Sequence, residues 1–165
     1  MTIIEKIAES VHEALDTKDA CGNTERVFPF YYDTPETINV RLDHADFPCA
    51  FLHVIESGVL ADVNGILKER LTCQVLFAAP TVLDFDGLEN EEIIDDLKRA
   101  AFIWLQVLKR SGDLKLASVQ NTQRLYATED AIVTAFGVTC DIEEVDGISF
   151  CDLPYKVGST ICTDE

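Results

Sequence analysis

The chain has 165 residues, 47% of them hydrophobic, and 30 acidic against 13 basic side chains give it a formal net charge of −17. This length and apolar content are those of one globular domain with its own core. The excess of acid argues against nucleic-acid binding, which relies on cationic side chains that displace counterions from phosphates. No run of 18 apolar residues predicts a membrane span, and Glu5 and Glu9 interrupt the stretch where a secretion signal needs an apolar run.

The first predicted element is an amphipathic helix from Thr2 to Leu15. Thr2 and Glu5 have the spacing of a capping box, in which the hydroxyl and the carboxylate each bind the other residue's backbone amide. The apolar residues recur at helical spacing and form one stripe: Ile3, Ile4, Ile7, Ala8, Val11, Ala14 and Leu15. Residues 16–26 have no periodicity and include Gly22 and Asn23, so they are expected to form a loop.

Three extended segments follow. Val27 to Tyr32 is rich in residues that favour strands, but Pro29 cannot donate to a ladder, so the segment is an edge strand or an irregular extended stretch. Ile38 to Leu42 alternates and is interpreted as a short strand or an extended loop. Cys49 to Ile55 is apolar at nearly every position, which is typical of a strand covered on both faces.

A long β-hairpin is predicted between Cys49 and Ala79. Its turn is Val63-Asn64-Gly65-Ile66, where Asn-Gly suits the positive φ angles of a type I′ turn. From Arg70 to Ala79 apolar and polar residues alternate, and Pro80 ends the strand. The hairpin tip has little core of its own to pack on, so it either flexes or rests on a neighbour.

The strongest pattern predicts a helix from Glu89 to Arg110. Its stripe is Ile93, Ile94, Leu97, Ala100, Ala101, Trp104, Leu105 and Leu108. The acids between Asp84 and Asp96 surround its N-terminus, where the helix dipole favours negative charge. Phe102, Ile103 and Val107 widen the apolar arc beyond the stripe. Two interpretations remain open: the helix is sandwiched within its own domain, or this extra surface is a subunit interface.

The last third of the chain is predicted to be mainly strand. Leu114 to Val119 is a strand, Asn121 to Arg124 is a polar turn, and Ala131 to Glu144 is a second strand. Ile148 to Cys151 is expected to pair back after a turn at Asp146-Gly147.

The predicted fold class is α+β, with a mostly antiparallel sheet, a long β-hairpin, and two helices packed on one face. We expect one domain over residues 1–151, followed by a C-terminal tail over 152–165.

No motif for catalysis, metal binding or cofactor binding is present in the sequence. The chain has no nucleophile elbow, phosphate-binding loop, dinucleotide fingerprint or zinc-protease motif. Its six cysteines form no C-x-x-C pair, which favours reduced thiols in a cytosolic setting over a metal site. His53, within the predicted strand from Cys49, has no partner indicated by a motif and is interpreted as a hydrogen-bonded sheet residue. We therefore predict no catalytic residue, metal or cofactor.

A family resemblance is carried by the order of the elements. The acidic N-terminal helix is followed by the hairpin around VNGILKERLTCQVLF, the helix DFDGLENEEIIDDLKRAAFIWL and the strand segment RLYATEDAIVTAFGVTCDIEE. Over about residues 1–151 this order resembles the tail-terminator, or tail-completion, proteins of long-tailed bacteriophages and prophages. The resemblance implies a non-enzymatic subunit that closes into a homo-oligomeric ring, commonly a hexamer, at the end of the tail tube. Its partners would be tail-tube and neck proteins, in the cytoplasm during assembly and then in the virion.

A ring needs a heterologous interface, in which one surface meets a different surface on the next copy. The candidate interface residues are Phe102, Ile103 and Val107 on the long helix, and Val63, Asn64, Gly65 and Ile66 at the hairpin tip. The alternative function is a cytosolic monomeric or dimeric binding module, or a small enzyme of unknown type.

Overall fold

The computed structural model describes residues 1–32, 45–61, 65–82, 88–126 and 133–149. The elements in chain order are α1 (Ile3–Leu15), β1 (Thr17–Lys18), β2 (Thr24–Arg26), β3 (Phe30–Tyr32), β4 (Cys49–Ala61), β5 (Ile66–Pro80), α3 (Leu88–Arg110), β6 (Leu114–Leu125), β7 (Val133–Glu144) and β8 (Ile148–Ser149). No helix among these residues is long and apolar enough to cross a membrane.

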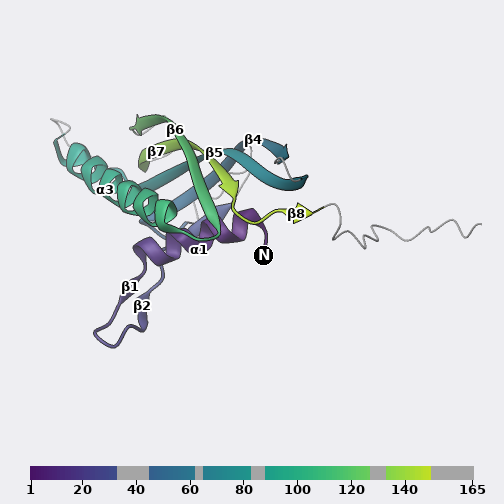
Figure 1. Ribbon diagram of the computed structural model, residues 1–165. Helices are drawn as coiled ribbons and strands as arrows, with labels where there is room; N and C mark the ends of the chain where they lie inside the picture. The colour runs from purple at the N-terminus through teal and green to yellow at the C-terminus, as the bar shows by residue number, and fades with distance from the viewer. Residues whose placement is uncertain (33–44, 62–64, 83–87, 127–132, 150–165) are drawn as a thin grey trace, which may run out of the picture.

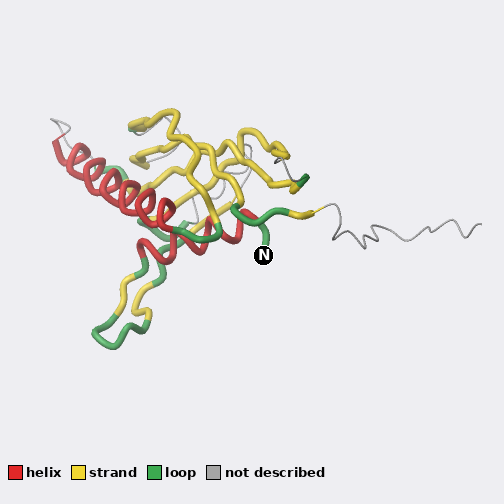
Figure 2. Tube along the Cα trace, in the orientation of Figure 1, coloured by secondary structure: helices red, strands yellow, loops and turns green. Residues whose placement is uncertain are grey.

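One large sheet organises the molecule, with strand order β3-β4-β5-β7-β6 and with β8 paired to β5 (Figure 1). Every pairing in it is antiparallel except that of β3 with β4. Both helices lie on one side of this sheet (Figure 2). The predicted α+β class is therefore confirmed, including its mostly antiparallel sheet and its two helices on one face.

The hydrophobic core lies between the helices and the covered face of the sheet. Side chains alternate along a strand, so every second residue of β5 and β7 points to this face. In β5 these are Leu71, Cys73, Val75 and Phe77, and in β7 they are Phe136, Val138, Cys140 and Ile142, all of them buried. The helices contribute Ile3, Ile7 and Val11 from α1 and Ile94, Leu97, Ala101, Trp104 and Leu108 from α3.

The predicted helices are found where the sequence placed them. The capping box of α1 is complete, since Glu5 Oε2 accepts from the Thr2 amide at 2.6 Å and Thr2 Oγ1 accepts from the Glu5 amide at 3.3 Å. The two helices are joined by a buried polar contact in which the Trp104 indole donates to Ser10 Oγ at 2.9 Å. Ser10 in turn donates to the Ile7 carbonyl, so both buried polar groups have partners.

Two predicted segments are corrected by the structure. Residues 16–26, expected to be a loop, contain β1 and β2, which pair as an antiparallel ribbon that projects from the body (Figure 1). Asp19 holds its turn by accepting from the amides of Cys21 and Asn23, each at 2.8 Å. This ribbon was missed because it has no buried face and therefore no apolar alternation.

The second correction concerns Asn121 to Arg124, expected to be a turn, which belongs to the continuous strand β6. The strand is predominantly polar because it lies at the edge of the sheet and most of its side chains are exposed. The other edge is formed by β3, as the proline in its segment predicted. Ile38 to Leu42, Val63, Asn64 and the tail 152–165 lie outside the described residues.

Candidate functional site

One part of the sheet that the helices leave uncovered is the far end of the hairpin of β4 and β5. In β4 the residues Cys49–Leu52 are buried, as the apolar run predicted, but exposure begins at Ile55 and reaches 69% at Val59. We call Ile55–Ala61 of β4 together with Ile66–Arg70 of β5 the hairpin overhang. Within it the two strands remain paired through Ala61 and Leu67.

The hairpin overhang is flanked by two pockets. The alternation of β5 puts Arg70 and Thr72 on the face away from the helices, while Leu71 between them is buried in the core. On that open face a pocket of about 350 Å³ is lined by Glu56, Gly58, Arg70, Thr72, Gln120 and Asp141. A second pocket, of about 410 Å³, is lined by Ser57, Gly58, Val59, Leu67, Lys68, Glu69 and Glu144.

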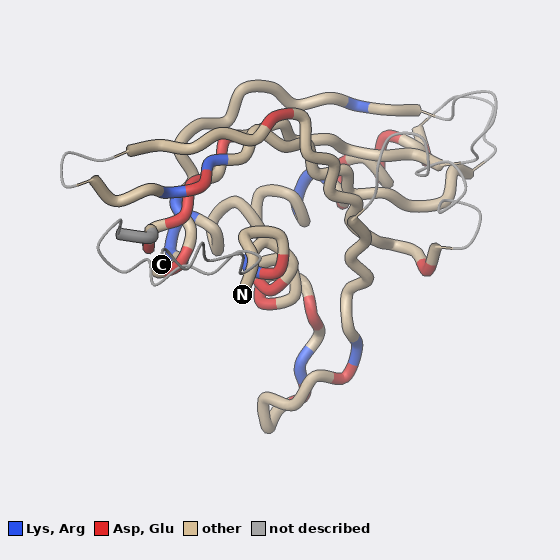
Figure 3. Tube along the Cα trace, turned by 90° about the vertical axis from the view of Figure 1, so that its right-hand side faces the viewer, with Lys and Arg blue, Asp and Glu red and all other residues tan. Residues whose placement is uncertain are grey.

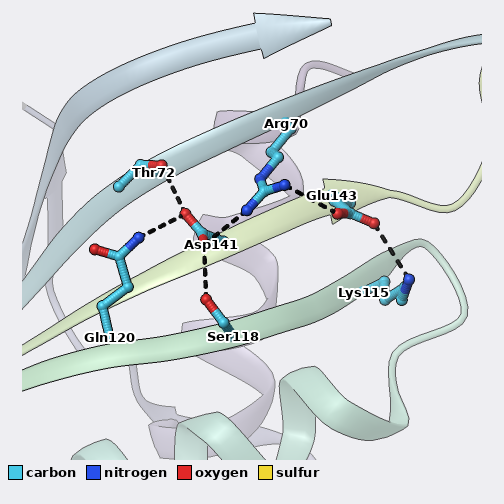
Figure 4. Close-up of polar contacts among 7 residues, drawn as sticks. All are labelled: Arg70, Thr72, Lys115, Ser118, Gln120, Asp141 and Glu143. Atoms are coloured by element: carbon cyan, nitrogen blue, oxygen red, sulfur yellow. Dashed lines mark hydrogen bonds and ion pairs between the residues drawn. The ribbon is translucent and has the colours of Figure 1, made fainter. Parts of the chain in front are cut away.

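Asp141 is the centre of a polar network at the open-face pocket (Figure 4). Its carboxylate is buried and accepts four side-chain hydrogen bonds from neighbouring strands, namely from Arg70 at 2.8 Å, Thr72 at 2.6 Å, Ser118 at 2.6 Å and Gln120 at 3.1 Å. The Arg70 guanidinium also lies 3.8 Å from Glu143, which pairs with Lys115 at 3.3 Å. The network therefore ties β5, β6 and β7 together on the face that has no helix.

This network fixes Asp141 in its charged form. The hydrogen bond from Ser118, followed by that from Thr72, lowers the pKa of the Asp141 carboxyl far below its ordinary range, against the opposing effect of burial. All four donors are already committed to Asp141, and such a saturated carboxylate is a poor proton acceptor. We interpret Asp141 as a structural anchor for the uncovered end of the sheet.

The predicted interface residues on α3 lie on its outer surface. Phe102 is 46% exposed and Ile103 is 43% exposed, while Val107 is half-buried. Phe102 also has a structural role, because its ring meets Phe136 edge-on with 6.1 Å between centroids. A pocket of about 310 Å³ beside them is lined by Asp95, Lys98, Arg99, Phe102, Ile103 and Gln106.

At the hairpin tip the structure describes two of the four predicted interface residues. Gly65 has a φ of 74°, the left-handed conformation that a glycine in such a turn permits. Ile66 is half-buried and pairs with Ser149 of β8. We call Phe102, Ile103 and Val107 the α3 patch, and this patch lies far from the hairpin tip. Phe102 contacts Phe136, which pairs with Phe77 near one end of β5, whereas Ile66 is at the other end of that strand.

The acidic run before α3 is described from Leu88 onwards. Glu89 and Glu91 lie in the first turn, as the helix dipole predicts. Glu91 holds the end of β6 by accepting hydrogen bonds from Arg124, at 2.5 Å, and from Tyr126. Asp84 and Asp86 lie outside the described residues.

Among the residues that the structure describes, the histidines and cysteines form no group of three or more with acids that could hold a metal ion, although Cys73 and Cys140 are direct neighbours across β5 and β7. His12 Nδ1 lies 3.2 Å from Asp16, and His53 is half-buried on β4 beside Gln74. Cys49, Cys73 and Cys140 are buried and Cys21 is exposed, and all four are free thiols. Burial raises the pKa of the Cys49 thiol to about 12, so this side chain packs as a neutral apolar group.

Sequence reasoning missed the polar network and the full length of β6, whose outer edge no described strand pairs with. The partners of Asp141 come from two other strands, β5 and β6, so no local spacing indicates them. No protein-family model matches this chain, and a search of curated protein sequences finds no similar protein.

Proposed function

We propose that this protein is a structural subunit that self-associates into a ring, of the tail-terminator type that its element order resembles. In that role it would close the end of a phage or prophage tail tube and contact tube and neck proteins. The observation that carries the proposal is the hairpin overhang. Its β4 strand is exposed beyond the helices, with Ile55 at 53% and Val59 at 69% exposure, while its β5 strand is half-buried.

The second support is the outer surface of α3. Phe102 and Ile103 are both more than two-fifths exposed, although α3 already buries five residues in the core. Large apolar side chains that remain exposed beside a pocket are typical of protein interaction sites. The overhang and this patch are different surfaces, and such a pair allows head-to-tail association.

The experiment is a measurement of mass in solution by light scattering and sedimentation over a range of concentrations. The wild-type chain is expected to form a species larger than a monomer as concentration rises. Ile103→Glu removes exposed apolar surface and adds charge, so it should weaken association by at least tenfold, about 1.4 kcal/mol.

Gln106→Glu is the matched control, because it adds the same charge beside the same pocket without removing apolar surface. If Ile103→Glu associates like this control, α3 has no part in the interface. A wild-type chain that stays monomeric at every concentration contradicts the proposed function itself.

A further inference from the structure

The sheet has two long edges that no strand among the described residues pairs with. On one side β3 pairs with β4 only at Ala50–Leu52, and no other described residue pairs with the outer edge of Ile55–Ala61. On the other side β6, 12 residues long, is paired only with β7. Free edges present unpaired N–H and C=O groups and are templates for pairing with another chain.

The two edges differ in charge. β6 carries Lys115 and Arg124 and no acid, although the whole chain has a net charge of −17 (Figure 3). Both cations are already paired within the chain, Lys115 with Glu143 and Arg124 with Glu91, so β6 is close to neutral rather than acidic. The outer segment of β4, Ile55–Ala61, carries Glu56 and no base. The Ile55–Ala61 segment of a second copy, with its Glu56, therefore meets less like-charge repulsion along β6, which has no acid, than along the matching β4 segment.

We propose that the β6 edge of one copy pairs with the Ile55–Ala61 edge of the next copy, so that the sheet continues from subunit to subunit. This inference rests on the proposed self-association and names the strands that carry it. Main-chain hydrogen bonds supply the affinity in such strand addition, and side chains supply the selectivity. Because the two joined edges are different, a copy that pairs through one edge can still pair with a further copy through its other edge. Such head-to-tail contacts form a ring when the rotation between copies closes.

The exposed side chains beside each edge fit this arrangement. Val119 on β6 is 45% exposed, and Phe102 lies near β6 because its partner Phe136 pairs with Arg124. On the opposite edge Ile55 and Val59 are both more than half exposed. Pairing of the edges would cover apolar surface on both copies, in addition to satisfying the backbone groups.

The test uses proline at one bulge in each edge. β6 shifts register between Leu116 and Ser118, and β4 shifts between Val54 and Glu56, so Ala117 and Ile55 have no Cα partner across the sheet. Proline is tolerated at bulges, and it blocks pairing with a further strand. Ala117→Pro therefore blocks the β6 edge, and Ile55→Pro blocks the β4 edge.

Each blocked variant alone should be a monomer at a concentration where the wild type assembles. An equimolar mixture should give a two-chain species and nothing larger, because only one productive pair of edges remains. If Ile55→Pro alone forms a dimer, β6 pairs with its own copy and the inference is overturned. If both variants assemble like the wild type, the inference is overturned while the proposed self-association stands.

Folding is checked by circular dichroism and thermal unfolding of each variant. Should a proline variant fail to fold, Ala117→Glu and Ile55→Lys replace the pair, since each gives its edge the charge of the strand it should meet. Each of these variants must be a monomer alone, and their mixture must assemble beyond two chains, because the altered β6 edge of one variant then meets the oppositely charged β4 edge of the other. Assembly of either variant alone overturns the inference. In the wild type, hydrogen exchange should slow in residues 55–61 and 114–125 on assembly, and unchanged exchange there contradicts the inference.

Discussion

At the scale of single residues, Asp141 shows how a surface sheet can contain a buried charge. The residue is 4% exposed and its carboxylate accepts from four side chains, so the desolvation of the charge is offset by hydrogen bonds. The sequence predicted the strand that contains Asp141, from Ala131 to Glu144. It could not predict burial, because the residues that shield Asp141 come from β5 and β6.

We predict that Asp141→Ala lowers the free energy of unfolding by about 1–3 kcal/mol at pH 7, because it leaves the donors of Thr72 and Arg70 without their acceptor. Urea unfolding measures this change. The control is Asp96→Asn, since Asp96 is an exposed carboxylate 3.8 Å from Arg99 and should contribute close to nothing. Equal effects of the two substitutions would show that the network adds no stability.

The pH dependence of stability follows from the lowered pKa of Asp141. A carboxylate whose pKa is depressed in the folded state stabilises the fold fully above its unfolded pKa, about 3.9, and this stabilisation is lost as pH falls below that value. The difference in stability between the wild type and Asp141→Asn should therefore shrink by about 1 kcal/mol between pH 7 and about pH 3. A difference that stays constant over this range contradicts the assignment.

At the scale of elements, prediction succeeded where an element buries one face and failed where it does not. α3 was identified because its buried stripe recurs at helical spacing, and β5 because Leu71, Cys73, Val75 and Phe77 alternate. In β6 only Leu114 is buried, and the ribbon of β1 and β2 is exposed throughout. Their strands are set by backbone pairing, which leaves no periodic mark in the sequence.

The turn between β7 and β8 is a close approach that only glycine allows. A Cβ at Gly147 would lie 2.4 Å from Ile66 Cγ2 and 2.5 Å from the Leu67 carbonyl oxygen, while a Cβ at Gly58 would meet nothing within 4 Å. We predict that Gly147→Ala lowers stability by about 1–3 kcal/mol. Gly58→Ala should be neutral or stabilising by up to about 1 kcal/mol, because alanine loses less entropy in a strand.

Chemical unfolding of both glycine variants, with hydrogen exchange at Ile66 and Leu67, measures the effect. Faster exchange in Gly147→Ala alone would show that β8 is held against the hairpin overhang by this contact. If Gly147→Ala retains wild-type stability and exchange, the backbone at the turn shifts freely and β8 does not fix the overhang.

At the scale of the whole molecule, shape favours association while charge opposes it. Surface that a second copy can cover is present on the β4 strand of the overhang, on the α3 patch and along the two sheet edges that no described strand pairs with. Each copy nevertheless has a net charge of −17, so two copies repel one another at long range. The cations of β6 are already paired with Glu143 and Glu91, so any local attraction to Glu56 on the next copy is at most that of one exposed ion pair, about 0.2–1 kcal/mol.

Long-range repulsion between many charges should therefore dominate the salt dependence. Raising the salt concentration shortens the screening length from about 30 Å at 0.01 M to about 3 Å at 1 M, which weakens repulsion between distant acids more than contacts within the interface. We predict that the assembled fraction of the wild type rises with salt between these limits, measured by sedimentation at fixed protein concentration. A fall in the assembled fraction with salt would mean that opposite-charge contacts at the interface outweigh the repulsion. An unchanged fraction would mean that the acids of neighbouring copies lie too far apart to repel one another, even at low salt.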